Sequence, residues 1–376
     1  MSSFRHEKIA GFLRGILLPE KGGLTFDRLA FPMKHLSRRK RWNCVLQEAR
    51  RIANPANGFG MPPILQIEPV NFCNLRCPAC ALGAGLIRRQ PAALSFDLYR
   101  SIIDQVKDHT CLMAFWAWGE PFLHEGACDM IRYARDNGIL VHTSTNGHFF
   151  RTRKEACRVI ESGLDSVIVC VDGLDQKTYE TYRVGGELGI VLESVRNLVE
   201  ERNFLGRENP RITLRFLVMR HNEHQAREFE RKALELGADA ASLRFPIVRR
   251  QNVDLEGRLD PLHEAYGTPT APRGRTGRAG IGRPAAHCGR PYGNLTIFSN
   301  GEVVLCENDE NASFSLGNAS RHGIRDILAS PHARDLLTSF RSRAGKLPFC
   351  ADCEANRHRG DSLNLQTRAF EKESRR

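Results

Sequence analysis

The sequence has no run of about 18 consecutive apolar residues, which excludes a membrane-spanning helix of ordinary length. The residues after Met1 lack the apolar core and the small-residue cleavage site of a secretory signal. No internal repeat is present, so a repeat architecture is not expected. These absences predict a cytoplasmic protein.

Nucleic-acid binding is not expected either, although 55 Lys and Arg residues against 43 Asp and Glu residues give a net charge of +12. The basic excess lies in Arg38–Arg41, in residues 273–283 and in the tail from residue 357 onwards. Runs of like charge are usually solvated segments. These runs lack the interleaved aromatic residues on which bases stack.

The chain is, by contrast, rich in cysteine, with twelve in 376 residues. In a long chain without a secretory signal, this number favours metal binding or catalysis over a disulfide framework. Seven cysteines form two spaced groups. The other five stand alone and are expected to pack as small apolar side chains; they are Cys44, Cys111, Cys128, Cys157 and Cys170.

The length and composition fit one large α/β domain with a smaller appendage. Apolar residues make up 41% of the chain and charged residues 26%, as in ordinary globular proteins. Residues 1–60 are basic and have apolar residues at helical spacing between Ile9 and Leu17, which predicts a helical extension. This extension either packs on the main domain or makes peripheral membrane contact.

Residues 61–250 alternate between strand and helix patterns. Six apolar segments predict strands, each followed by a helical pattern; the strands are expected at 64–67, 112–118, 139–143, 166–171, 212–218 and 241–246. Regular alternation indicates a parallel sheet with helices outside. Six units predict an α/β fold of the partial (β/α)6 TIM-like barrel type, in which functional residues lie at the C-terminal ends of the strands.

The C-terminal third differs in pattern from the barrel. Residues 251–287 are rich in Gly, Pro and Arg and are expected to form a linker or lid. Residues 288–355 are expected to form a small domain, in which Asn300-Gly301 between two apolar runs predicts a β-hairpin. Residues 356–376 form a basic tail.

The first cysteine group is Cys73, Cys77 and Cys80, on the loop after the first predicted strand. Thiolate is a soft ligand that suits iron–sulfur clusters or zinc. Three protein ligands leave one metal position open, as in catalytic sites. A zinc site in which Cys77 and Cys80 join a remote pair is the alternative.

The spacing of this group resembles the signature of the radical S-adenosylmethionine (SAM) superfamily. The resemblance implies a [4Fe-4S] cluster whose open iron binds SAM. Three later segments resemble the accessory SAM-binding motifs of the family, in the expected order after the second, third and fourth strands. They comprise Gly119-Glu120-Pro121, Ser144-Thr145-Asn146-Gly147 and Val171-Asp172-Gly173.

The resemblance assigns SAM contacts to Gly119, Glu120, Pro121, Ser144, Asn146 and Asp172. Arg183, which follows the next helix, is expected to touch the substrate or the SAM carboxylate. A surface arginine that caps a helix is the alternative for Arg183. Two positions depart from the family pattern: Ala79 stands where an aromatic residue is common, and Cys170 stands where serine is common.

The second cysteine group consists of Cys288, Cys306, Cys350 and Cys353. It resembles the C-terminal SPASM/twitch extension of radical SAM enzymes, in a short form with one auxiliary [4Fe-4S] cluster. Four ligands would close this cluster completely, which implies electron transfer or a structural role. A structural zinc site with four cysteines is the alternative.

The resemblance implies an oxidoreductase that reductively cleaves SAM to a 5′-deoxyadenosyl radical and abstracts hydrogen from an unactivated C–H bond. The one-cluster spacing is similar to that of dehydrogenases of aminocyclitols, so a sugar-like small molecule is the expected substrate. Flavodoxin or ferredoxin is the expected electron donor. The alternatives are a maturase of a ribosomally made peptide, a structural zinc protein and a membrane-surface protein.

Overall fold

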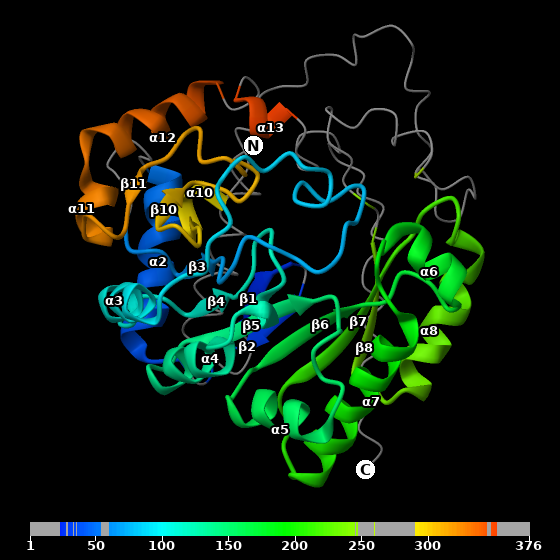
Figure 1. Ribbon diagram of the computed structural model, residues 1–376. Coiled ribbons are helices and arrows are strands. Elements are labelled where there is room, and N and C mark those ends of the chain that lie inside the picture. Colours follow the sequence, from blue (N-terminus) through cyan, green and yellow to red (C-terminus); the bar gives the residue numbers. More distant parts are fainter. Residues whose placement is uncertain are drawn as a thin grey trace, which may run out of the picture.

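A computed structural model of the chain describes residues 23–27, 29–32, 34, 36–53, 60–244, 246, 259, 290–343 and 347–351. Within these ranges the chain forms a nine-stranded sheet and a separate two-stranded hairpin (Figure 1). The strand order of the large sheet is β11-β10-β9-β3-β4-β5-β6-β7-β8. No described helix is long and apolar enough to cross a membrane.

Six neighbouring parallel strands, from β3 to the edge strand β8, confirm the predicted partial (β/α)6 barrel. They are β3 (Ile64–Ile67), β4 (Leu112–Ala114), β5 (Leu140–Thr145), β6 (Ser166–Cys170), β7 (Arg211–Leu217) and β8 (Ala240–Arg244). Because the strands are parallel, their C-terminal ends and the loops that follow meet at one edge.

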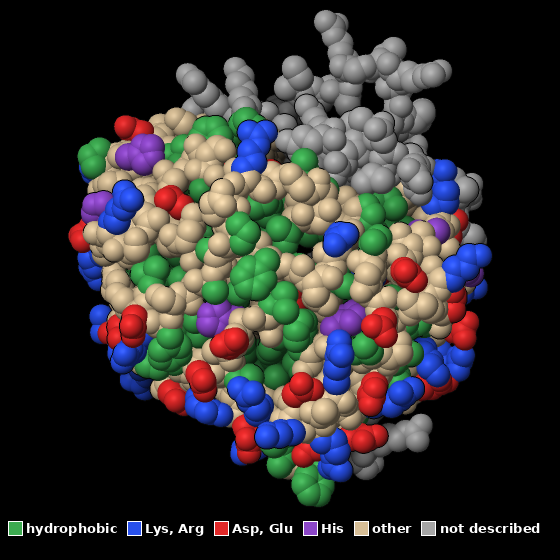
Figure 2. Space-filling view, viewed as in Figure 1, with side chains coloured by type: hydrophobic (Ala, Val, Ile, Leu, Met, Phe, Trp, Pro, Cys, Tyr) green, Lys and Arg blue, Asp and Glu red, His purple; other side chains and the backbone are tan. Residues whose placement is uncertain are grey.

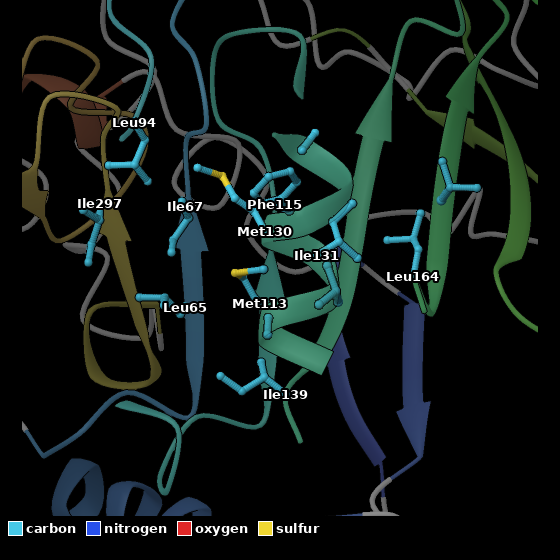
Figure 3. Close-up of a cluster of buried hydrophobic side chains, with 14 of the residues drawn as sticks. Leu65, Ile67, Leu94, Met113, Phe115, Met130, Ile131, Ile139, Leu164 and Ile297 are labelled. Atoms are coloured by element: carbon cyan, nitrogen blue, oxygen red, sulfur yellow. The ribbon is translucent and has the colours of Figure 1, made fainter. Parts of the chain in front are cut away.

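Helices cover the convex face of the sheet. They are α3 (Phe96–Val106), α4 (Ala127–Asp136), α5 (Arg153–Glu161), α6 (Gln176–Tyr182), α7 (Leu188–Phe204) and α8 (Ala226–Glu235). Side-chain caps define several N-termini, including the capping box of Thr152 and Glu155 on α5. The main core lies between helices and strands, where Met130 and Ile131 of α4 pack on Met113 and Phe115 (Figure 3).

The opposite, concave face of the sheet is the lumen of the barrel. The hairpin of β1 (Gly23–Phe26) and β2 (Leu29–Pro32) packs there, behind β5 and β6 in Figure 1. Its Phe26, Leu29 and Phe31 contact Ile64, Leu112, Leu140 and Ile168 in a second apolar cluster. Helix α2 (Arg38–Ala53) follows the hairpin. The sequence indicated only helix in this N-terminal extension; residues 1–22 lie outside the described residues.

The C-terminal segment extends the same sheet. Strand β9 (Asn294–Ile297) pairs in parallel with β3, and β10 (Glu302–Val304) pairs antiparallel with β9. The predicted hairpin is confirmed, and Gly301 in its turn has a φ of 84°. The remaining elements are α10 (Arg290–Gly293), β11 (Gly317–Asn318), α11 (Ile324–Ala329), α12 (Pro331–Arg343) and α13 (Pro348–Ala351).

The predicted linker at 251–287 lies outside the described residues except for Leu259, and so does the basic tail at 356–376. Basic and acidic side chains intermingle over α4, α5 and α7 on the face shown in Figure 2. That face therefore presents a mixed charge distribution.

Candidate metal and cofactor site

The three cysteines of the first group lie on the loop that follows β3. Cys77 is buried in an apolar cluster with Leu75 and Tyr182, and Cys73 and Cys80 pack against this cluster. The Cys80 amide donates to the Cys77 carbonyl over 3.1 Å, which closes a turn between these two ligands. The loop therefore brings all three sulfurs to one small apolar cluster at the C-terminal edge of the sheet.

Nitrogen donors surround these sulfurs. The Leu75 amide and the Asn146 side chain donate to Cys73 Sγ over 3.4 and 3.7 Å, and Arg183 Nη1 donates to Cys77 Sγ over 3.6 Å. Such bonds stabilise sulfur that carries negative charge and are a common setting of iron–sulfur clusters. The soft ligand set together with these donors fits a cluster.

Burial raises the pKa of Cys73 to about 12 and that of Cys77 to about 11, although Arg183 partly offsets the effect at Cys77. A metal must therefore displace the thiol protons when it binds. Among the described residues, no three His, Cys, Asp or Glu side chains are close enough to hold a single metal ion.

Gly119-Glu120-Pro121 follows β4 and packs directly on the cysteine loop. A Cβ atom on Gly119 would lie 2.0 Å from the Val70 carbonyl oxygen, so only glycine fits this approach. The Glu120 amide donates to the Phe72 carbonyl over 3.0 Å, and Pro121 opens the short 3-10 helix Pro121–Leu123. The segment thereby fixes the chain just before Cys73.

Glu120 is only 3% exposed, and its carboxylate accepts hydrogen bonds from other residues of the protein. Thr145 Oγ1 donates to Oε1 over 2.7 Å, and the Asn146 amide donates to Oε2 over 2.8 Å. Burial raises the pKa of Glu120 to about 7, against the lowering effect of these hydrogen bonds. The structure thus shows that Glu120 joins its own segment to the segment Ser144-Thr145-Asn146-Gly147. Its predicted contact with SAM remains a prediction.

The segment Ser144-Thr145-Asn146-Gly147 lies at the end of β5. Ser144 Oγ is 3.7 Å from Cys170 Sγ on β6, and Asn146 Nδ2 donates to Asn74 Oδ1 over 2.8 Å. Asn146 Oδ1 is 2.9 Å from Nδ1 of His148, a buried residue that sequence analysis missed. Its position immediately after the motif was the available signal.

Asp172 and Arg183 form an ion pair beside Cys77. Arg183 Nε donates to Asp172 Oδ2 over 2.5 Å, and the Leu217 amide donates to Asp172 Oδ1 over 2.6 Å. Asp172 is fully buried, and Asn222, a second missed residue, donates to its carbonyl over 2.9 Å. Arg183 therefore connects the fourth-strand motif to Cys77, and its predicted contact with SAM or substrate remains a prediction.

Both departures from the family pattern lie in this region. Ala79 packs in the apolar cluster of Cys77, whereas Cys170 faces the lumen next to Ser144. The small side chain of Ala79 thus stands at the position where an aromatic residue is common, and the thiol of Cys170 replaces a hydroxyl on the lumen side. The seven predicted cofactor-binding residues do gather at one edge of the sheet.

The structure describes two of the four cysteines in the second group, since Cys288 and Cys353 lie outside the described residues. Cys306 follows β10, and Cys350 lies on α13; both contact the main apolar core. Arg290 Nη1 lies 4.0 Å from Cys306 Sγ and pairs with Glu307. Attraction to Arg290 holds the pKa of Glu307 below its ordinary value, although burial would raise it.

The two cysteine groups are joined by a direct contact between their loops. Arg89, which follows the first group, forms a bidentate ion pair with Glu68 over 2.6 and 2.8 Å. Arg89 Nε donates to the Glu310 carbonyl over 2.7 Å, and the Arg88 amide donates to Asn311 over 2.6 Å. The segment after Cys306 is thus bound to the segment after Cys80.

Two family models match the chain. The model described as the radical SAM superfamily matches residues 67–233, and the SPASM model, an iron–sulfur cluster-binding domain, matches residues 288–354. The first match contains all three cysteines of the first group, and the second contains all four cysteines of the second group.

Two curated relatives match part of this chain, with more than a quarter of the aligned residues identical. The tungsten-containing aldehyde ferredoxin oxidoreductase cofactor-modifying protein of Pyrococcus furiosus is 29% identical over 52% of this chain and 56% of its own length. Mycofactocin maturase MftC of Mycolicibacterium smegmatis is 26% identical over 71% of this chain and 69% of its own length. The chain thus matches little more than half of the Pyrococcus protein.

A solved structure with a similar fold is SuiB from Streptococcus suis. Bound to SAM, it gives a TM-score of 0.60 at 15% identity, over 84% of this chain and 76% of SuiB. Bound to the precursor peptide SuiA, it gives 0.57 at 14% identity, over 94% and 83%. At this identity the likeness shows the fold.

Proposed function

The chain belongs to the radical SAM superfamily and carries a SPASM domain, and we propose that it is a radical SAM oxidoreductase that modifies a ribosomally made peptide. The observation that carries the proposal is the three-cysteine loop after β3, packed against three motifs from neighbouring strand ends. The proposed cofactors are SAM, one [4Fe-4S] cluster on this loop and an auxiliary [4Fe-4S] cluster held by the second group.

A peptide substrate is better supported than the sugar-like molecule expected from the cysteine spacing. MftC is named as a maturase, and SuiB, whose fold this chain shares, has been solved with a precursor peptide. Neither of these two proteins is named for the oxidation of an aminocyclitol. The electron donor is proposed to be flavodoxin or ferredoxin, because the chemistry begins with the delivery of one electron.

The protein residues have three tasks in this proposal. Cys73, Cys77 and Cys80 hold the cluster, which when bound supplies the electron that cleaves SAM. Glu120 holds the strand-end motifs together through Thr145 and Asn146. Arg183, fixed by Asp172, places a positive charge against one cluster ligand and stabilises its negative charge.

Anaerobic reconstitution tests the cluster and its chemistry together. We expect about eight iron atoms per chain, from two four-iron clusters, and formation of 5′-deoxyadenosine from SAM after reduction. Cys77→Ala should retain the auxiliary cluster, lose about half of the iron and form no 5′-deoxyadenosine. Iron, sulfide and zinc analysis separates this outcome from a structural zinc protein.

The control is Cys128→Ala, which removes a partly buried cysteine on α4 outside both groups. It should retain the iron content and SAM cleavage of the wild type. Cleavage of SAM at the wild-type rate by Cys77→Ala would overturn the proposed function.

A further inference from the structure

The lumen contains a cluster of polar side chains that the proposed cofactors leave unused. Alternate residues of each strand face the lumen. On β5 and β6 the inward positions include His142 and Ser166, on β7 they include Thr213 and Arg215, and on β8 they include Ser242 and Arg244. Their strand neighbours Val141, Val167, Ile212, Leu214 and Ala241 instead pack in the main core under the helices.

Two of these residues are arginines that converge on one carboxylate. Arg215 Nη1 lies 2.6 Å from Asp27 Oδ2, and Arg244 Nη2 lies 3.4 Å from Asp27 Oδ1. Arg244 Nη2 also donates to the Asp27 carbonyl over 2.5 Å. Asp27 follows β1 in the turn of the lumen hairpin, with a φ of 49° in the left-handed region. The chain therefore adopts an uncommon conformation where it presents this carboxylate.

The electrostatics of this position favour an anion. Burial alone would raise the pKa of Asp27, but attraction to Arg215, then to Arg244 and His142, holds it below its ordinary value. His142 is fully buried, and burial lowers its pKa to about 4, so it is neutral at pH 7. Asp27 thus supplies one negative charge between two arginines.

The site offers more hydrogen bonds than Asp27 takes up. Several buried donors that face the lumen have no hydrogen-bond partner among the described residues; they are Ser166 Oγ, Thr213 Oγ1, Ser242 Oγ, and Arg215 Nε and Nη2. Buried donors are rarely left without partners, because the loss of hydration is costly. Unpaired donors gathered around an arginine pair indicate a polar ligand that carries acceptor oxygens.

The site lies at the level of the cofactor motifs. Arg215 is the register partner of Cys170, whose side chain faces the lumen 3.7 Å from Ser144. The Val171 amide donates to the Arg215 carbonyl over 2.8 Å, and Val171 immediately precedes Asp172. A ligand held by Arg215 would therefore lie one strand away from the fourth-strand motif.

We propose that Arg215 and Arg244 form a carboxylate-binding site for an acidic side chain of the peptide substrate, and that Asp27 occupies this site in the free enzyme. The assignment of a peptide rests on the proposed function, whereas the carboxylate site itself does not. Exchange of one carboxylate for another leaves the arginine charges compensated. Among the described residues the hairpin pairs with no strand of the large sheet, so its turn can move without breaking that sheet.

The first experiment asks whether the site binds a carboxylate when Asp27 is removed. Thermal unfolding of reconstituted Asp27→Ala is measured in increasing sodium acetate, against sodium chloride of the same ionic strength. We expect a lower Tm than that of the wild type, and a saturating rise of the Tm with acetate only. Asp27→Asn, which keeps the shape of the side chain, replaces the alanine variant if that variant fails to fold.

The matched control is Asp239→Ala, which also removes a carboxylate that pairs with an arginine, Arg202, but outside the lumen. Acetate should not raise the Tm of this variant above the value in chloride. The double variant Asp27→Ala/Arg215→Gln should also lose the response to acetate. The proposed carboxylate site would be wrong if acetate failed to raise the Tm of both Asp27→Ala and Asp27→Asn. It would also be wrong if acetate raised the Tm of Asp239→Ala by the same amount.

The second experiment asks whether an acidic peptide displaces Asp27. Hydrogen exchange of the hairpin is followed in the presence of two capped five-residue peptides. One is Gly-Gly-Glu-Gly-Gly and the other is Gly-Gly-Gln-Gly-Gly. We expect the Glu peptide alone to accelerate exchange in the wild type, and neither peptide to do so in Arg215→Gln. Equal effects of the two peptides would overturn the exchange of Asp27 for substrate.

The two proposals fail in different ways. If acetate raises the Tm of Asp27→Ala while the reconstituted wild type forms no 5′-deoxyadenosine, the carboxylate site stands and the proposed function falls. If SAM is cleaved but acetate has no effect, the proposed function stands and the carboxylate site falls.

Discussion

At the scale of single residues, the motif side chains mostly bind one another. Glu120 accepts from Thr145 and Asn146, and Asp172 pairs with Arg183. The sequence predicted these residues as neighbours, because each follows a strand of one parallel sheet. It could not predict their mutual contacts, since these depend on how three separate loops fold over the same edge.

The pH dependence of stability tests the buried state of Glu120. Burial raises its pKa from 4.5 to about 7, so between these values the folded protein retains a proton that the unfolded chain has lost. Rising pH therefore destabilises the fold through this group, fully above pH 7 and not at all well below 4.5. We expect wild-type stability to fall by about 2 kcal/mol between pH 5.5 and 8, relative to Glu120→Gln.

Anaerobic urea unfolding of both proteins at several pH values gives this difference. Contributions from other titrating groups cancel in the comparison, because the two proteins differ only at residue 120. Parallel stability curves across this range would show that Glu120 ionises as readily in the fold as in the unfolded chain.

At the scale of elements, the sequence predicted those strands and turns that depend on interactions between residues close in the chain. The strands of the barrel and the turn at Asn300-Gly301 follow from apolar periodicity and from the preference for glycine at positive φ. The hairpin at Gly23–Pro32 was missed because no helical pattern follows its first short strand, whereas the equally short β3 belongs to a regular strand–helix alternation. Its stability comes from distant lumen residues such as Leu112 and Ile168, which the local sequence does not reveal.

Substitution of Gly301 tests the turn that orients β10 and, after it, Cys306. At its φ of 84° an added Cβ would lie 2.7 Å from Asn318 Oδ1. We expect Gly301→Ala to lower the free energy of unfolding by about 2 kcal/mol, from backbone strain and this contact together.

The matched control is Gly206→Ala, at a φ of 62° with no atom within 4 Å of the added Cβ. It should cost about 1 kcal/mol, from backbone strain alone. Equal losses in the two variants, measured by urea unfolding, would show that the contact with Asn318 contributes nothing.

At the scale of the whole molecule, the C-terminal segment and the barrel share one sheet. Strand β9 pairs with β3 although more than half of the chain separates them in sequence. The sequence predicted a small C-terminal domain here but not that its strand β9 would join the barrel sheet, because parallel pairing between distant strands leaves no local signal. The shared sheet places the loop of the first cysteine group against the segment that follows Cys306.

The buried ion pair of Arg89 and Glu68 lies in the barrel and links the two parts through hydrogen bonds to Glu310 and Ser299. The side chains of the ion pair are 5% and 0% exposed, and Ser299 on the C-terminal side donates to Glu68 over 3.0 Å. Removal of one partner leaves an uncompensated buried charge, which costs about 3–5 kcal/mol. We therefore expect Arg89→Met to destabilise the protein by this amount and to accelerate hydrogen exchange in β9 and β10.

The double variant Arg89→Met/Glu68→Gln removes both charges and should regain most of the stability, as a double-mutant cycle of unfolding free energies will show. Additive losses in the cycle, with exchange in β9 and β10 unchanged, would mean that the parallel strands alone hold the two parts together.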